Sequence, residues 1–290
     1  MIDAHAHLWE KQSGRVGGLP VFDLGGGRSQ FGAEVRQMLP PYITDGINSA
    51  ERLLANMDFA QVAAAVITQE YIDGSQDAYL RRVREQDPVR FRVTSLYEEK
   101  PLSEDLSLFD GIKICGGRLA DPDLTKHAEV FARAAAEDKF IAIDMADGDT
   151  QCASLREMAQ QYPALRIAIG HFGMVTVPGW QEQIRLARFP NVFVESGGIT
   201  WLFNSEFYPY PSAVRAILEA RDICGIGKLM WGSDYPRTMT VITYRMSWDF
   251  IEKSPLLSGD EKHKFFHANA ESFYRFAGLP EMPCIRHMAE

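Results

Sequence analysis

Two histidines near the start of the chain have the spacing of a chelating pair. They lie in an apolar run that reads Asp-Ala-His-Ala-His over residues 3–7. Because residues two apart on a strand face the same side, His5 and His7 can offer their imidazoles to one metal ion. A later apolar run ends at Asp234, whose carboxylate can serve as a hard oxygen ligand or a proton acceptor. These residues predict a hydrolytic metal site built on strand ends.

Short apolar runs alternate with amphipathic stretches along the whole chain. The expected strands are residues 2–5, 62–68, 90–96, 111–115, 140–145, 166–171, 192–196 and 229–234. Expected helices include residues 49–58, 77–86, 126–138, 152–161, 179–188 and 212–222. Strands that alternate with helices imply parallel pairing through crossovers, and eight such units favour a (β/α)8 TIM barrel over an open sheet. The length of 290 residues suits one such domain spanning residues 1–290.

Three further segments interrupt or close this pattern. Residues 10–47 form a long loop after the first strand, which we expect to be either functional or disordered. Residues 198–211 are rich in aromatic side chains and predict a substrate-pocket wall or lid; a cover for the barrel rim or a subunit contact remains an equal alternative. Residues 258–278 predict a terminal helix that closes the barrel.

A third imidazole falls at another strand end. His171 follows the apolar run Arg-Ile-Ala-Ile-Gly, so a barrel would bring it to the same face as His5, His7 and Asp234. Three imidazoles and one carboxylate on that face predict a catalytic site. The alternative is that these are four unrelated polar strand ends.

Several motifs together resemble the amidohydrolase superfamily, and most closely its Amidohydro_2 branch. They are Asp-Ala-His-Ala-His at residue 3, Gly-Ile-Lys at 111, Gly-His-Phe-Gly at 170, Trp-Gly-Ser-Asp-Tyr-Pro at 231 and Asn-Ala-Glu-Ser-Phe at 269. The resemblance spans nearly the whole chain and implies a (β/α)8 barrel. It also implies a metal site that draws on His5, His7, His171 and Asp234.

The fifth expected strand departs from the commonest pattern of that branch. It offers Asp144 where decarboxylase-like members carry a histidine. Asp144 can therefore be a ligand, a hydrogen-bond acceptor for a histidine, or a substrate contact. An acidic residue here resembles the lactonase members, some of which work without a metal. The expected cofactor is one divalent ion, most simply Zn²⁺, with an empty site as the alternative.

Other polar residues at the same face are candidates for binding substrate. Lys113 ends the fourth strand and could bind a carboxylate or stabilise an oxyanion, with a salt bridge as the alternative. Arg237, and secondarily Arg118, could grip a substrate carboxylate bidentately. The remaining candidates are Glu195, Glu70, Asp144 and Trp201.

Composition narrows the class of protein and of partner. A net charge of −9 argues against general nucleic-acid binding, although it leaves room for a carboxylate-bearing small molecule. No apolar run is long enough for a membrane span, and no secretory signal is recognised. The four cysteines are far apart, which favours reduced thiols and a cytoplasmic location. A homo-oligomer is compatible with the sequence.

The leading functional hypothesis is hydrolysis of a lactone or another carboxylic ester. Asp234 would act as the general base, and His171 would bind the metal or polarise the carbonyl. One alternative is a non-oxidative decarboxylase of an aromatic or enoic acid, which Asp144 disfavours. An alternative of another class is an inactive barrel that serves as a binding protein.

Overall fold

Eight parallel strands form the central sheet of the protein, for which a computed structural model describes residues 1–286 and 288. In spatial order they are β1 (Ile2–Ala6), β6 (Ala64–Ile67), β7 (Phe91–Tyr97), β8 (Gly111–Cys115), β9 (Phe140–Asp144), β10 (Ile167–Ile169), β11 (Val192–Glu195) and β12 (Leu229–Met230). The sheet closes just beyond β12, where the amide of Ala4 donates to the carbonyl of Trp231 and Ala6 pairs with Tyr235. The predicted (β/α)8 barrel is confirmed.

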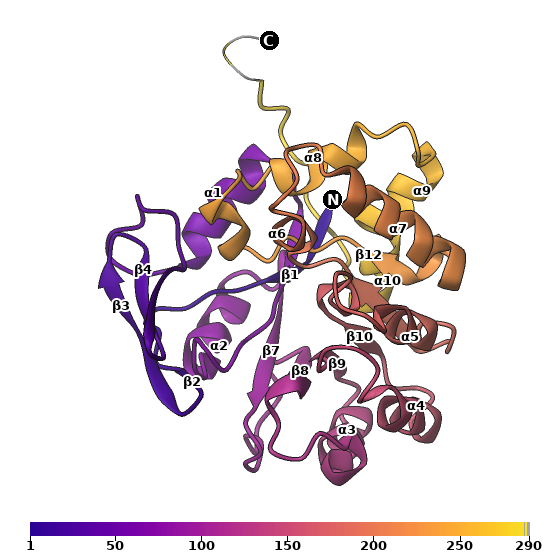
Figure 1. Cartoon of the computed structure of the whole chain (residues 1–290). Coiled ribbons are helices and arrows are strands. Elements are labelled where there is room, and N and C mark those ends of the chain that lie inside the picture. The colour runs from indigo at the N-terminus through magenta and orange to yellow at the C-terminus, as the bar shows by residue number, and fades with distance from the viewer. Residues whose placement is uncertain (287, 289–290) are drawn as a thin grey trace.

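Helices surround the barrel in the order that the sequence predicts (Figure 1). The α-helices are α1 (Ala50–Phe59), α2 (Asp77–Gln86), α3 (Ala128–Ala136), α4 (Cys152–Gln161), α5 (Trp180–Leu186), α6 (Ile199–Leu202), α7 (Pro211–Cys224), α8 (Met246–Glu252), α9 (Gly259–His263) and α10 (Asn269–Tyr274). Short 3₁₀ turns are η1 (Gly116–Arg118), η2 (Leu124–His127), η3 (His171–Gly173), η4 (Ile226–Lys228) and η5 (Arg237–Thr240), and the π-turn η6 (Lys264–Ala268) joins α9 to α10. No helix in the described part of the chain has the length and apolar character that crossing a membrane requires.

The barrel strands are almost continuously apolar because both of their faces are covered. Ile141 and Ile143 of β9 belong to the large core between barrel and helices. Phe140 and Ala142 of the same strand instead join a second cluster with Phe273 and Tyr274. That second cluster fills the barrel interior and seats α10 against it, so the predicted terminal helix does close one end of the barrel.

A register shift in β1 explains how the histidine pair reaches the open end of the barrel. Ile2 and Ala4 pack in the inner cluster, whereas Ala6 packs in the outer core. The pairing of β1 with β6 shifts between Asp3 and Ala6, as in a β-bulge. The side-chain alternation therefore changes phase within β1, and His5 and His7 both face the site above the inner cluster.

The long loop after β1 is present, but it is folded. It contains an antiparallel sheet of β2 (Arg15–Val16), β3 (Leu19–Gly25), β4 (Arg28–Phe31) and β5 (Glu34–Gln37). Figure 1 shows this sheet in indigo beside α1 and α2. Val21 and Met38 pack on Ile72, and Ser13 and Arg15 bond to the backbone of residues 71–73. The loop thus supports the segment after β6, which lines the cavity described next.

Candidate active site

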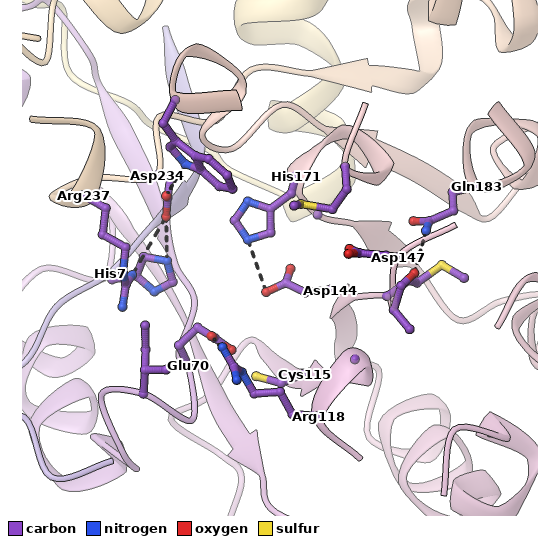
Figure 2. Close-up of a pocket in the computed structure, with 17 residues that line it drawn as sticks. His7, Glu70, Cys115, Arg118, Asp144, Asp147, His171, Gln183, Asp234 and Arg237 are labelled. Carbon is purple, nitrogen blue, oxygen red and sulfur yellow. Dashed lines mark hydrogen bonds and ion pairs between the residues drawn. The ribbon is translucent and has the colours of Figure 1, made fainter. Parts of the chain in front are cut away.

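The carboxyl ends of the barrel strands surround a cavity of about 490 Å³. Eight of the predicted site residues line it, namely His7, Glu70, Arg118, Asp144, His171, Trp201, Asp234 and Arg237. Figure 2 shows His7 and Asp234 on one side of this cavity and His171 with Asp144 on another. The remaining predicted residues, His5, Lys113 and Glu195, are almost fully buried behind this lining. A cavity at this end of the barrel is where TIM-barrel enzymes carry their active sites.

His5, His7 and Asp234 converge on one point. The Nε2 atoms of His5 and His7 are 3.0 Å apart, and Oδ1 of Asp234 is 3.0 Å from Nε2 of His7. The same oxygen is 3.8 Å from Nε2 of His5. The ligand atoms of all three residues lie within 4.8 Å of one another, so they form a group that could hold a metal ion.

The hydrogen bonds on the far side of each imidazole fix which nitrogen faces this point. His5 directs Nδ1 to Oε1 of Glu195 at 2.7 Å, and His7 directs Nδ1 to the carbonyl of Thr68 at 3.2 Å. Both acceptors require a proton on Nδ1, which leaves the Nε2 lone pairs directed at each other and at Asp234. Two lone pairs and a carboxylate oxygen repel one another unless a cation lies between them. The residues present therefore fit a divalent metal with two imidazole ligands and one carboxylate ligand.

The charge states of these residues suit that role. Burial, together with the charge of Arg237, holds the pKa of His7 well below its usual value, so the imidazole is neutral and can act as a ligand. Burial alone would raise the pKa of Asp234. The neighbouring His7 ring and the charges of Arg237 and His171 outweigh burial and hold that pKa well below the usual range. Asp234 is therefore a carboxylate at neutral pH.

A second chain of contacts runs from His171 through Asp144 to Lys113. The Nε2 atom of His171 is 3.4 Å from Oδ2 of Asp144, and Nζ of Lys113 is 2.6 Å from the same oxygen. The other nitrogen of His171, Nδ1, lies 2.9 Å from the carbonyl of Gly197. Lys113 is 1% exposed and does not reach the cavity in the described structure. The salt-bridge alternative for Lys113 is thus the arrangement observed, although the bridge is buried.

This ion-pair chain keeps His171 positively charged. Burial would favour the neutral imidazole, but the charge of Asp144 and its hydrogen bond outweigh burial and raise the pKa of His171 to about 10. Burial would likewise raise the pKa of Asp144, and the charges of Lys113 and His171 instead hold it well below its usual value. Both nitrogens of His171 therefore carry protons. To act as the predicted fourth metal ligand, His171 would have to lose a proton, so that role stays a prediction.

The two candidate arginines differ in the strength of their contacts with neighbouring carboxylates. Arg237 donates from Nη2 to Oδ2 of buried Asp73 at 2.5 Å. The side chain of Arg118 is 39% exposed and has one looser contact, 3.5 Å from Nε to Oε2 of Glu70. Both arginines line the cavity, and Figure 2 shows Arg118 beside Glu70 and Cys115. Arg118 is therefore the cation that an entering anion can engage without breaking a buried ion pair.

The aromatic segment contributes one side chain to the cavity. Trp201 lines it, whereas Tyr210 is buried in the outer core and Phe207 is 91% exposed. Tyr208 donates its hydroxyl to Asp249. The segment thus forms part of the cavity wall at Trp201 and is exposed to solvent at Phe207. Aromatic composition alone does not show which of these side chains reaches the cavity.

Two carboxylate partners of the site, Asp73 and Asp3, were among those that sequence reasoning missed. Asp73, which accepts a hydrogen bond from Arg237, lies in the loop between β6 and α2. It belongs to none of the sequence motifs that indicate the amidohydrolase resemblance. Asp3 precedes the histidine pair and accepts hydrogen bonds from Ser233 and Tyr244, which ties β1 to the segment that carries Asp234. The signal for Asp3 was present in the Asp-x-His-x-His spacing, but its partners lie more than 200 residues away.

The protein-family model described as amidohydrolase matches residues 2–276. No curated protein sequence matches the chain. A probable 2-pyrone-4,6-dicarboxylic acid hydrolase from Acinetobacter baumannii, solved with citric acid bound, is 17% identical with a TM-score of 0.71, covering 95% of this chain and 99% of its own. A zinc-bound amidohydrolase from Burkholderia multivorans is 17% identical with a TM-score of 0.70, covering 96% and 99%. A 2,6-dihydroxybenzoate decarboxylase from Rhizobium is 13% identical with a TM-score of 0.57, covering 79% and 89%.

At these identities the solved structures establish similarity of fold, and the family follows from the sequence model. That match covers all eight barrel strands, the histidine pair and Asp234. The chain therefore belongs to the amidohydrolase family.

Proposed function

We propose that this amidohydrolase hydrolyses a lactone or another carboxylic ester at the carboxyl end of its barrel and uses one Zn²⁺. The observation that carries the proposal is the convergence of two imidazole nitrogens and a carboxylate oxygen next to a cavity. Zinc suits nitrogen and oxygen ligands in a site that keeps a position open for substrate. His5, His7 and Asp234 would hold the ion. A divalent ion there acts as a Lewis acid and makes water a better nucleophile near neutral pH.

Asp234 lies where it can accept and then donate the proton that this reaction transfers. Its Oδ1 faces the histidine pair, while the residue as a whole lines the cavity. As a carboxylate it can accept a proton from the attacking water and return that proton to the leaving oxygen. The backbone of Asp234 has a positive φ of 58°, which is unusual for a residue with a side chain and is found at sites where the fold imposes a functional geometry.

His171 supplies positive charge beside the histidine pair, since its ring centroid lies 4.6 Å from that of His5. Its protonated Nε2 is held by Asp144 at 3.4 Å, a long contact that an entering carbonyl oxygen could replace. An N–H donor there would stabilise the negative charge that develops on the carbonyl oxygen as water adds. Lys113 and Asp144 would then act by keeping His171 charged and oriented.

The chemical names of two structural relatives bear on this choice. A 2-pyrone is a cyclic ester, so the Acinetobacter hydrolase is named for lactone cleavage, and the Rhizobium enzyme is named for decarboxylation. The first is also the more similar structure, with a TM-score of 0.71 against 0.57. Lactone hydrolysis is therefore our first proposal, and decarboxylation is the alternative outcome of the test.

The test is product analysis over a panel of lactones, carboxylic esters and aromatic carboxylic acids. The zinc-loaded protein should release an acid and no carbon dioxide from at least one lactone or ester. Release of carbon dioxide from an aromatic acid, without ester cleavage, would replace this proposal with the decarboxylase. If the protein turns over neither the lactones and esters nor the aromatic acids, the hypothesis that remains is a binding protein without catalytic activity.

Arg118 is expected to bind a carboxylate of the substrate. Replacing it by Met should raise KM for a carboxylate-bearing lactone by about 10- to 100-fold, since a hydrogen bond to a charged group contributes about 1.5–3 kcal/mol. The kcat value should change little, because this contact is made in the ground state as well as in the transition state. Arg118→Lys should retain part of the affinity. Steady-state kinetics on the same lactone with its carboxylate methylated gives the control, for which Arg118→Met should have no effect.

A further inference from the structure

The indole of Trp201 makes a direct contact with the proposed catalytic carboxylate. Its Nε1–H donates to Oδ2 of Asp234 at 2.7 Å, a short and charge-assisted hydrogen bond. The ring also meets His171 edge-on, with centroids 5.8 Å apart. Trp201 thus contacts both Asp234 and His171, although it lies at least 30 residues from either of them in the sequence.

This hydrogen bond gives the two oxygens of Asp234 different surroundings. Oδ1 lies against Nε2 of His7 at 3.0 Å, and Oδ2 accepts the indole proton. A free carboxylate rotates about its Cβ–Cγ bond and exchanges its oxygens. The indole contact prevents that rotation and keeps Oδ1 directed at the histidine pair.

The local backbone is arranged to admit the indole at this place. Trp201 lies in α6, which follows Gly198 at a positive φ of 69°. A Cβ atom added to Gly198 would overlap the indole nitrogen of Trp201. Gly198 is therefore required twice, for its left-handed conformation and for the close approach of the ring.

We propose that Trp201 is a positioning residue for the metal site, which it serves by fixing the carboxylate of Asp234 as a ligand. This role goes beyond the wall of the substrate cavity that its ring also forms. It rests on the metal site proposed above, and it is independent of which substrate the enzyme takes. A partner that orients a metal ligand in this way typically accounts for about 10- to 100-fold in metal affinity or activity.

The test measures zinc affinity, so it needs no substrate. Metal-free wild-type protein and Trp201→Phe are titrated with Zn²⁺ in competition with a chromophoric chelator. Trp201→Phe keeps an aromatic ring but lacks the N–H donor, and we expect its Kd for zinc to rise by about 10-fold or more. Circular dichroism establishes that the variant is folded. Because a smaller ring also changes packing, a second protein carries 3-benzothienylalanine at position 201, which replaces the indole N–H by sulfur at nearly the same shape and should show the same loss.

Trp248→Phe is the matched control. Trp248 is also mostly buried and packs edge-on against Phe266, but its indole nitrogen has no hydrogen-bond acceptor among the described residues. The zinc affinity of the Trp248→Phe variant should equal that of the wild type. Equal affinities in the wild type, Trp201→Phe and the benzothienyl protein would overturn the role of Trp201 alone. A wild type that binds no zinc would overturn the proposed metal site and this role together.

Discussion

Replacing Asp234 by Asn should lower kcat by about 10³-fold or more while the protein stays folded. Asn has nearly the shape of Asp but cannot accept a proton at neutral pH, and general acid–base groups typically contribute about 10²- to 10⁴-fold. The loss of a negatively charged metal ligand adds to that effect. The measurement is the steady-state rate of lactone hydrolysis at saturating zinc, together with a thermal unfolding curve.

The control for this variant is Asp110→Asn. Asp110 is a partly buried carboxylate that pairs with Arg84 and precedes β8, at the other end of the barrel. Its rate per folded molecule should match the wild type, even if the lost ion pair lowers stability. An Asp234→Asn enzyme within a few-fold of the wild-type rate would remove Asp234 from the mechanism.

Replacing Lys113 by Met should destabilise the protein by about 3–5 kcal/mol. Lys113 is 1% exposed and pairs at 2.6 Å with Asp144, so the variant leaves a mostly buried carboxylate without its main counter-charge. Breaking one partner of a buried ion pair carries a penalty of that order, which exceeds the value of an exposed salt bridge. Urea unfolding of the wild type and the variant measures the difference in free energy of unfolding.

A double variant separates this charge effect from a packing effect. In Lys113→Met/Asp144→Asn the carboxylate is neutralised, so the buried charge that the single variant leaves is gone. We expect the double variant to be more stable than Lys113→Met, with a coupling of about 0.5–3 kcal/mol between the two sites. A Lys113→Met protein that loses less than about 1 kcal/mol would show that the pair is solvated and not buried as described.

The barrel and the location of the site were predictable from sequence because both depend on local patterns. Continuous apolar runs mark strands that are buried on both faces, and polar residues that follow such runs collect at one edge of a parallel sheet. His5, His7 and Asp234 can therefore be grouped from the sequence alone. Their hydrogen-bond partners cannot, since Glu195 and Thr68 contact the histidines from segments far away in the sequence.

The roles of individual side chains were less predictable than their positions. Lys113 and Arg237 were expected to meet substrate, and the structure pairs Lys113 with Asp144 and Arg237 with Asp73. A sequence shows that a cation lies near a strand end, but not whether a carboxylate already neutralises it. The long loop after β1 was also expected without regular structure, because the turn residues that separate its short strands resemble a coil when read alone.

The most direct test of the metal-dependent mechanism is a zinc titration of the metal-free wild-type enzyme with lactone hydrolysis as the readout. We predict negligible hydrolysis without metal and a rate that rises linearly until about one equivalent of zinc is bound, in line with one ion held by His5, His7 and Asp234. The His7→Gln variant should need far more zinc to reach any activity. A metal-free enzyme that hydrolyses the same lactone at the full rate would contradict the mechanism, because the convergent ligands would then have no part in the reaction.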